Sequence, residues 1–243
     1  MALLKRTPVI EVLDLCKTYY MAGGMSQSVL KKITFSVEAG EFVAIMGHSG
    51  SGKSTLMNIL GCLDRPTSGI YKLDGKPISD KTDNELAQIR GYEIGFVFQN
   101  FNLLMKRSIA DNVSLPLIYQ GVGEKERYER AVQMLHKVQL DGYQDRLPTQ
   151  ISGGMQQRVA IARALINNPK IIFADEPTGN LDSKTSDEIM NLFTDLNKQG
   201  ITIVLVTHEE DVADYATRMI KIGDGQKVYD GLRSKYEGRD SPC

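Results

Sequence analysis

Residues 47–54 of this chain read GHSGSGKS and lie between the apolar run FVAIM, residues 42–46, and the run TLMNIL, residues 55–60. Glycine, four free positions, glycine, lysine and serine is the pattern of a phosphate-binding loop. The flanking runs are typical of a buried strand and a helix, which is the context that the pattern requires. We therefore expect nucleotide phosphates to bind at Gly47, His48, Ser49, Gly50, Ser51, Gly52, Lys53, Ser54 and Thr55.

The residue types of this loop predict its chemistry. Glycines let the backbone turn several N–H groups toward one anion, and the start of the helix adds partial positive charge. Lys53 is expected to reach the β- and γ-phosphates, and the Ser54 hydroxyl to ligate Mg²⁺. The competing interpretation is a glycine-rich turn whose lysine binds nothing. It is disfavoured because the full pattern, between a strand and a helix, seldom arises by chance.

The composition is that of a globular protein of 243 residues, with 42% apolar and 24% charged residues and a formal net charge of −1. Such a balance gives no field that attracts nucleic acid, so we expect no nucleic-acid partner. No apolar run approaches the roughly 20 residues that a membrane-spanning helix needs. Any membrane is therefore expected to belong to a partner.

The first half of the chain predicts strands and an inserted group of helices. Short strands are expected at residues 9–15, 30–37, 70–73 and 94–98, in an antiparallel region and part of a main sheet. The pattern then changes, and residues 124–138 form an amphipathic helix. We expect one face of this helix to carry Tyr128, Val132, Leu135 and Val138.

The second half alternates helices with fully apolar strands. Strands are expected at residues 171–174 and 201–206, and helices from about residue 155 and around residues 189–196. This order is typical of a parallel α/β sheet, whose ligands bind at the carboxyl ends of the strands. The residues that follow three such strands, Gly47, Asp175 and His208, should therefore meet at one edge of the sheet.

Side chains at this edge suit phosphate chemistry. Asp175 is expected to hold Mg²⁺, and Glu176 to act as a base or an orienting group for the attacking water. His208 is expected to position the γ-phosphate and that water. In a chain without a phosphate loop, Asp175 and Glu176 would more often be the charged end of a strand, and His208 would more often be a histidine that caps or packs.

A second anion site is expected at Ser152, Gly153 and Gly154, at the start of a helix. The alternative is a simple N-cap with a flexible entry. Because one nucleotide has no need of two cradles, this one is expected to close over a nucleotide held by another copy of the chain.

Together these motifs resemble the nucleotide-binding subunit of an ATP-binding-cassette (ABC) transporter over residues 9–231. The resemblance rests on the phosphate loop, Gln99, Ser152 to Gly154, Asp175 with Glu176, the NLD at 180–182, and His208. It implies an α/β fold, a P-loop NTPase with a RecA-like parallel sheet core, an antiparallel β subdomain and an inserted α-helical subdomain. Residues 1–243 would form one domain, with the core at 1–98 and 160–232, the helical subdomain at about 99–159, and a frayed polar tail at 233–243.

The same resemblance implies roles for residues and cofactors. ATP and Mg²⁺ would be bound, and Tyr19 would stack on the adenine. Gln99 would ligate Mg²⁺ and sense the γ-phosphate, and Asp182 would lie beside the nucleotide along a dimer seam. Two copies would sandwich two ATP molecules and hydrolyse them, each ATP between Lys53 of one copy and Ser152 of the other.

A finer resemblance, to the macrolide-export and lipoprotein-release branch, rests on residues 56–64 (LMNILGCLD), 96–99 (FVFQ) and 174–182 (ADEPTGNLD). It implies a peripheral protein on the cytoplasmic face of the inner membrane, with a separate permease, an extracytoplasmic adaptor, and export or extraction of a substrate. A membrane complex of cell division or signalling, driven without transport, is the alternative. A phosphate-loop kinase fits less well, because it has no use for the second cradle.

Two further stretches, residues 151–155 and 101–105, bear on the dimer and on the contact with the permease. The signature reads ISGGM at residues 151–155, where the family usually has Leu first and Gln last, so Met155 is expected to slow closure of the dimer. Residues 101–105 (FNLLM) belong either to the core of the helical lobe or to a groove for a short permease helix.

Overall fold

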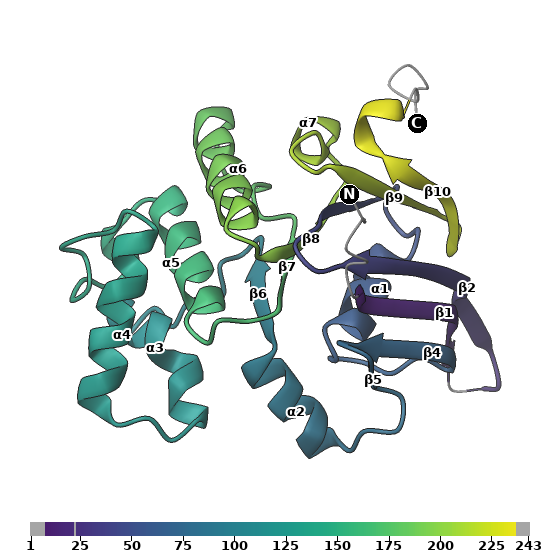
Figure 1. Cartoon of the computed structure of the whole chain (residues 1–243), viewed down its shortest axis with the longest axis horizontal. Coiled ribbons are helices and arrows are strands. Elements are labelled where there is room, and N and C mark those ends of the chain that lie inside the picture. Colours follow the sequence, from purple (N-terminus) through teal and green to yellow (C-terminus); the bar gives the residue numbers. More distant parts are fainter. Residues whose placement is uncertain (1–7, 22, 237–243) are drawn as a thin grey trace, which may run out of the picture.

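The structure, a computed structural model, describes residues 8–21 and 23–236. Its strands form two sheets (Figure 1). The antiparallel sheet has the order β2-β1-β4-β5 and contains β1 (Pro8–Tyr20), β2 (Ser26–Glu38), β4 (Ser68–Leu73) and β5 (Lys76–Pro77). The second sheet has the order β10-β9-β3-β8-β7-β6 and contains β3 (Phe42–Met46), β6 (Ile94–Phe98), β7 (Ile171–Asp175), β8 (Thr202–Thr207), β9 (Arg218–Gly223) and β10 (Gln226–Leu232).

The second sheet is parallel from β6 to β9, and only β10 runs antiparallel to its neighbour β9. Strand β3 shows why its sequence is continuously apolar. Val43 and Ile45 pack into the core shared with the antiparallel sheet, whereas Ala44 and Met46 pack into the core shared with the helices. A strand buried on both faces has no polar side to show. The expected P-loop NTPase fold with a parallel core is thereby confirmed.

The helices gather mainly at one end of the molecule. Figure 1 shows a helical lobe of α3, α4 and α5 at one side of the parallel sheet and the antiparallel sheet at the other. The helices are α1 (Lys53–Leu60), α2 (Asp83–Tyr92), α3 (Ile109–Tyr119), α4 (Glu124–Lys137), α5 (Gly153–Leu165), α6 (Ser183–Lys198) and α7 (Glu210–Ala213), with 3₁₀ turns at Pro148–Gln150 and Arg233–Lys235.

The prediction for the buried face of α4 was wrong in part. Leu135 is buried, but Tyr128 and Val132 are 42% and 38% exposed. The buried stripe of the helix instead contains Ala131 and Met134. Tyr128 lies at the rim because its hydroxyl donates a hydrogen bond to Asp145 at 3.0 Å, so its polar end stays at the surface.

Two segment boundaries differ from the sequence-based expectation. The expected end of the helical subdomain near residue 159 falls inside α5, which continues to Leu165 and packs on β6 and α3. The tail expected to fray from residue 233 is packed as far as the structure describes it. Arg233 is 5% exposed, and its guanidinium pairs with Glu210 and Asp214. The rest of the expected tail, residues 237–243, lies outside the described residues.

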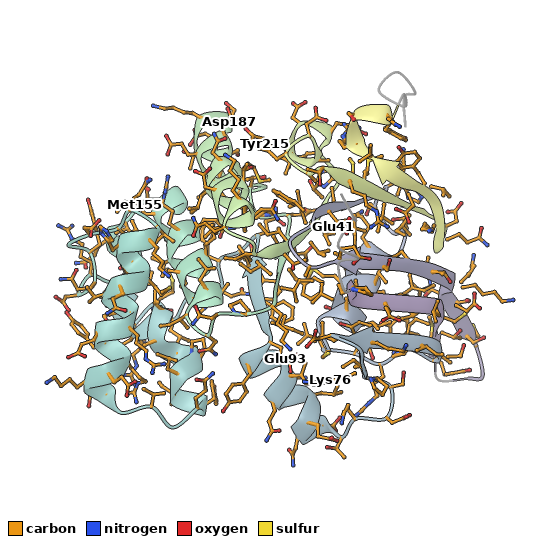
Figure 2. All side chains as sticks on the ribbon, in the orientation of Figure 1. Glu41, Lys76, Glu93, Met155, Asp187 and Tyr215 are labelled. Carbon is orange, nitrogen blue, oxygen red and sulfur yellow. The ribbon has the colours of Figure 1, made fainter. Side chains whose placement is uncertain are left out.

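Several elements of the fold were not predicted, among them α2, α7, β9 and β10. The antiparallel sheet is tied to the α2–β6 connection by Lys76 and Glu93, which lie side by side in Figure 2 with Nζ 3.2 Å from Oε1. The turn between β9 and β10 is clamped between β2 and the phosphate loop. Gly225 in this turn has a φ of +77°, and a Cβ there would lie 2.1 Å from the Val29 carbonyl oxygen.

Candidate functional site

Four strands of the parallel sheet end at one cavity of about 740 Å³. The phosphate loop follows β3, the acidic pair stands at the end of β7, His208 follows β8, and β9 contributes a lysine near its carboxyl end. The cavity is lined by Val29, Met46, Gly47, His48, Ser49, Gly50, Gly52, Lys53, Ser54, Thr55, Asp175, Glu176, Val206, His208, Glu210 and Lys221. The expected meeting of Gly47, Asp175 and His208 at one sheet edge is thus observed.

The backbone of the phosphate loop has no room for side chains at two glycines. A Cβ on Gly47 would lie 2.2 Å from the Ile222 carbonyl oxygen, and one on Gly52 would lie 2.8 Å from Leu30 Cδ2. Gly52 also adopts a φ of +106° and is the N-cap of α1, with no side chain to cap the helix. The first N–H groups of α1 therefore remain free to bind an anion.

Lys53 places a cation at the floor of this loop. It is 8% exposed, and its Nζ donates hydrogen bonds to the carbonyl oxygens of Gly47 and His48 at 2.7 and 3.0 Å. Burial lowers the pKa of Lys53, and the nearby carboxylates of Glu176 and Asp175 act against that shift. These two carbonyl oxygens accept the hydrogen bonds that Lys53 Nζ would otherwise donate to a phosphate oxygen.

Polar atoms of the loop fit a phosphate ligand. The hydroxyl of Ser51 is buried and has no hydrogen-bond partner in the described part of the chain. Such an orphaned donor in a closed site is costly unless a ligand satisfies it. Ser54 and Thr55 line the cavity with their hydroxyl-bearing side chains at the first turn of α1. Ser51 itself does not line the cavity, and its Oγ atom lies against Gly47.

The acidic pair and His208 form the opposite wall. Burial raises the pKa of Asp175, the charge of Glu176 raises it further, and the Lys53 ammonium acts in the opposite sense. Glu176 has a φ of +45°, and its backbone N–H donates to the Val206 carbonyl oxygen at 2.8 Å. The Nδ1 atom of His208 lies 2.8 Å from Glu176 Oε1. The histidine thereby holds one carboxylate oxygen of Glu176 in place.

Gln99, expected at the Mg²⁺, does not line the cavity in a single chain. Its Nε2 donates to Asn180 Oδ1 at 3.4 Å, and Asn180 Nδ2 donates back to the Gln99 carbonyl oxygen at 3.1 Å. A Cβ on Gly179 would lie 2.6 Å from Gln99 Nε2. Gln99 therefore packs against the segment that joins β7 to α6, next to the acidic pair.

The expected adenine and seam residues have local partners instead. The ring of Tyr19 lies 4.7 Å from Lys17 Nζ, and its hydroxyl donates to Asp64 Oδ2 at 2.9 Å. Asp182 is the N-cap of α6 and accepts hydrogen bonds from the N–H and hydroxyl of Thr185 at 3.0 and 2.7 Å. Neither residue lines the cavity.

The second cradle also stands apart from the cavity. Ser152 is the N-cap of α5, and its hydroxyl accepts a hydrogen bond from the N–H of Met155 at 3.3 Å. A Cβ on Gly153 would touch only Leu181 and Phe101, at 3.5 and 3.7 Å, so this helix start is open. Gly154 packs against Thr185, since a Cβ there would lie 2.4 Å from Thr185 Cγ2. Figure 2 shows Met155 on the helical lobe, well away from Glu41, which precedes β3.

Three polar residues near the site were missed in the sequence. Glu210 and Lys221 line the cavity, and Gln157 is fully buried in α5 with Nε2 donating to the Pro177 carbonyl oxygen at 2.6 Å. Glu210 follows His208 by two residues, which is a weak signal. Gln157 occupies a helix position among apolar residues, and a buried glutamine of this kind needs a fixed partner.

The described residues contain neither a membrane-spanning helix nor a cluster of metal ligands. No helix among them has the length and apolar character to span a bilayer. No group of three or more His, Cys, Asp or Glu side chains within residues 8–21 and 23–236 could by itself hold a metal ion.

Known proteins resemble this chain over most of its length. A family model described as ABC transporter matches residues 30–179. The chain is 56% identical over 209 residues to YknY of Bacillus subtilis (strain 168), an uncharacterized ABC transporter ATP-binding protein, and the match covers 86% of this chain and 91% of YknY. It is 54% identical over 220 residues to MacB of Syntrophobacter fumaroxidans, a macrolide export ATP-binding/permease protein, covering 89% of this chain and 31% of MacB. The chain thus spans about a third of the MacB length.

Solved structures give the same result. The ATP-binding cassette MJ0796, described as a dimer in a post-hydrolysis state bound to ADP and Pi, has a TM-score of 0.84 and 45% identity, covering 93% of this chain and 100% of that one. A phosphate loop, an acidic pair and a histidine at one sheet edge, together with this likeness in sequence and fold, show that the chain belongs to the ABC transporter family as an ATP-hydrolysing ATP-binding cassette.

Proposed function

We propose that two copies of this chain bind two ATP molecules head to tail, so that each ATP lies between Lys53 of one copy and Ser152 of the other. The observation that carries this proposal is the open cradle at the start of α5. Ser152 caps this helix through the N–H of Met155 alone, and Gly153 leaves space above the helix start, yet none of the cradle residues lines the cavity of its own chain. A solved relative of the same fold is described as dimeric.

Each cavity supplies positive charge and N–H donors for the phosphates. Lys53 exchanges its two carbonyl acceptors for phosphate oxygens, and the loop amides donate to the same group. Mg²⁺, where bound, would be held by Ser54, Gln99 and Asp175 and would neutralise phosphate charge. Because the pKa of Asp175 is raised by burial, a neighbouring cation stabilises its ionised form.

Hydrolysis then depends on the placement of Glu176. One carboxylate oxygen accepts a hydrogen bond from the attacking water and takes up a proton, while His208 holds the other oxygen. His208 also lines the cavity, and its second ring nitrogen, Nε2, would contact the γ-phosphate. Gln99 is tied to Asn180, so movement of the helical lobe is transmitted to the segment that follows the acidic pair.

The partner that this ATPase drives is proposed to be a separate membrane permease, with the chain on the cytoplasmic face of the inner membrane. The similarity to MacB, named as a macrolide exporter, supports export or extraction of a substrate, with an extracytoplasmic adaptor as a further partner. A cavity of about 310 Å³ between β6 and the helical lobe supplies a docking groove, and Asn102, Leu115 and Pro116 line it. Nearby, Leu104 and Met105 are 45% and 47% exposed.

The sandwich is tested with Glu176→Gln. This variant keeps the shape of the side chain but cannot accept a proton, so it is expected to bind ATP, to lose turnover and to form a stable dimer. Size-exclusion chromatography with light scattering in ATP and Mg²⁺ measures the mass, and Glu129→Gln on the exposed face of α4 serves as the control. A monomer at saturating ATP would count against the shared site.

A further inference from the structure

Lys221 lines the ATP cavity, although no sequence motif contains it. Strand β9 pairs in parallel with β3 and sets Lys221 opposite Met46, the residue before the phosphate loop. Met219 packs into the core that the helices share, whereas Ile220 and Ile222 pack on the other face of the sheet. Since side chains alternate along a strand, Lys221 lies on the same face of the sheet as Met219, the face that α3 to α7 cover.

The last described residues of the chain hold this lysine. Residues 233–236, called here the C-terminal strap, follow β10 and turn back over β9. Lys221 Nζ donates a hydrogen bond to the Tyr236 hydroxyl at 2.6 Å and lies 5.1 Å from the centre of the Tyr236 ring. Neither contact is an ion pair, so the tyrosine holds the side chain of Lys221 in place without a carboxylate beside it.

The strap acts on a second residue of the cavity. Arg233 is almost fully buried, and its guanidinium pairs with Glu210, which lines the cavity, and with Asp214. A carboxylate at the rim would repel phosphate groups, and the Arg233 charge offsets that repulsion. The strap therefore favours an anion at this rim in two ways, through Glu210 and through Lys221.

The charges of the cavity wall single out Lys221. Glu176 is held by His208, and Glu210 by Arg233. Lys53 lies close enough to Asp175 and Glu176 for their charges to act on its pKa. No carboxylate within residues 8–21 and 23–236 forms an ion pair with Lys221. Two of its three N–H donors also have no partner in that part of the chain.

We propose that Lys221 is a second phosphate-contacting cation of the ATP site and that the C-terminal strap positions it through Tyr236. This inference rests on the proposed function, since it requires ATP to occupy the cavity above Lys53. Lys221 would donate to an oxygen of the phosphate chain on the β9 side of the loop, across from the acidic pair. It would add affinity for a polyanion without taking part in proton transfer.

The test is equilibrium binding of ATP and ADP to the full chain by calorimetry at two ionic strengths. Lys221→Met is expected to weaken binding about tenfold, or about 1.4 kcal/mol, and to make the affinity depend less steeply on salt, because one screened charge is gone. Lys221→Arg should restore most of the affinity. The control is Lys198→Met, which removes an exposed ammonium at the end of α6.

The outcomes separate this inference from the proposed function. Failure of the unchanged chain to bind ATP, or full binding by Lys53→Met, would remove the proposed function itself. Normal binding by the unchanged chain with equal affinities for Lys221→Met and Lys198→Met would overturn the role of Lys221 alone. Tyr236→Phe keeps the ring and removes the hydroxyl, and we expect a two- to threefold loss. No change in Tyr236→Phe, beside a loss in Lys221→Met, would overturn the role of the strap.

Discussion

Replacing Gln157 with leucine should disturb the catalytic wall of the cavity without touching the phosphate loop. The Nε2 atom of this fully buried side chain donates to the carbonyl oxygen of Pro177, which follows Glu176, at 2.6 Å. The same atom lies 3.5 Å from the carbonyl oxygen of Phe98, which precedes Gln99. One side chain of α5 thereby holds the two segments that carry Glu176 and Gln99.

The structure sets the size of the effect. Leucine would leave the Pro177 carbonyl unpaired, at a cost of about 1–3 kcal/mol. Gln157 Oε1 has no partner among the described residues, so the substitution also removes one unsatisfied atom, and we expect a net loss near 1–2 kcal/mol. For a chain of this size that lowers Tm by about 2–8 °C. A shift of Glu176 by about 1 Å costs up to roughly 100-fold in kcat.

Thermal unfolding, steady-state ATPase rates and ATP binding measure these effects for Gln157→Leu. The matched control is Gln156→Leu, one position earlier on α5, where the amide donates to Pro148 and Ile151 carbonyls away from the acidic pair. We expect Gln157→Leu to lose both Tm and kcat relative to this control, with its Kd for ATP within about twofold. Equal Tm and kcat in the two variants would refute the reasoning.

Three further predictions concern the signature, the core and the docking groove. Met155→Gln should speed ATP-dependent turnover, because an amide replaces a thioether at the start of α5, and unchanged turnover and ATP affinity would show that the position is neutral. Tyr71→Phe should cost about 1–3 kcal/mol in chemical denaturation, since its buried hydroxyl donates to the Leu60 carbonyl at 2.6 Å. The control Tyr128→Phe should cost under about 0.5 kcal/mol, and equal losses would contradict this ranking. Leu104→Asp should reduce permease co-purification and permease-stimulated ATPase activity, because Leu104 is an exposed apolar side chain of residues 101–105, and wild-type values for both would exclude this residue from the permease contact.

Strands β3, β6, β7 and β8 of the parallel sheet could be predicted because their sequences are almost continuously apolar. Residues 94–98 form β6 with the expected bounds, β7 ends one residue later than the expected 171–174, and β8 begins and ends one residue later than the expected 201–206. The meeting of the phosphate loop, Asp175 and His208 followed from the direction of these strands. Strand direction is a property of sequence order in a βα repeat, so it needs no knowledge of side-chain packing.

Other parts of the fold depended on contacts that no local pattern contains. The tail looked polar, yet Arg233 is buried because Glu210 and Asp214 meet it there. Tyr128 matched the apolar period of α4, but its hydroxyl keeps it at the rim. The β9–β10 hairpin did leave a signal, the pair Asp224 and Gly225 between two strands of mixed apolar and polar residues, because Asp-Gly is a recognised hairpin turn.

The site residues divide in the same way. The residues that follow strand ends could be predicted from the fold, whereas Tyr19, Gln99 and Asp182 were assigned from the resemblance. In a single chain each of these three forms a hydrogen bond with another residue of the same chain. Their proposed roles require a bound nucleotide or a second copy. Lys221 could not be found, because a lysine in a strand is ordinarily a solvated side chain and only the three-dimensional structure places it at the cavity.

The shared site is tested most directly by adding Gly153→Asp to the Glu176→Gln variant and measuring mass and ATP binding together. The new carboxylate fits locally, since a Cβ at Gly153 has contacts of 3.5 Å or more, and Gly123→Asp at the open start of α4 is its control. We predict that each copy still binds ATP but that the ATP-dependent dimer disappears, because the charge meets the partner's phosphates. A dimer as stable as that of Glu176→Gln alone would contradict a nucleotide held between two copies.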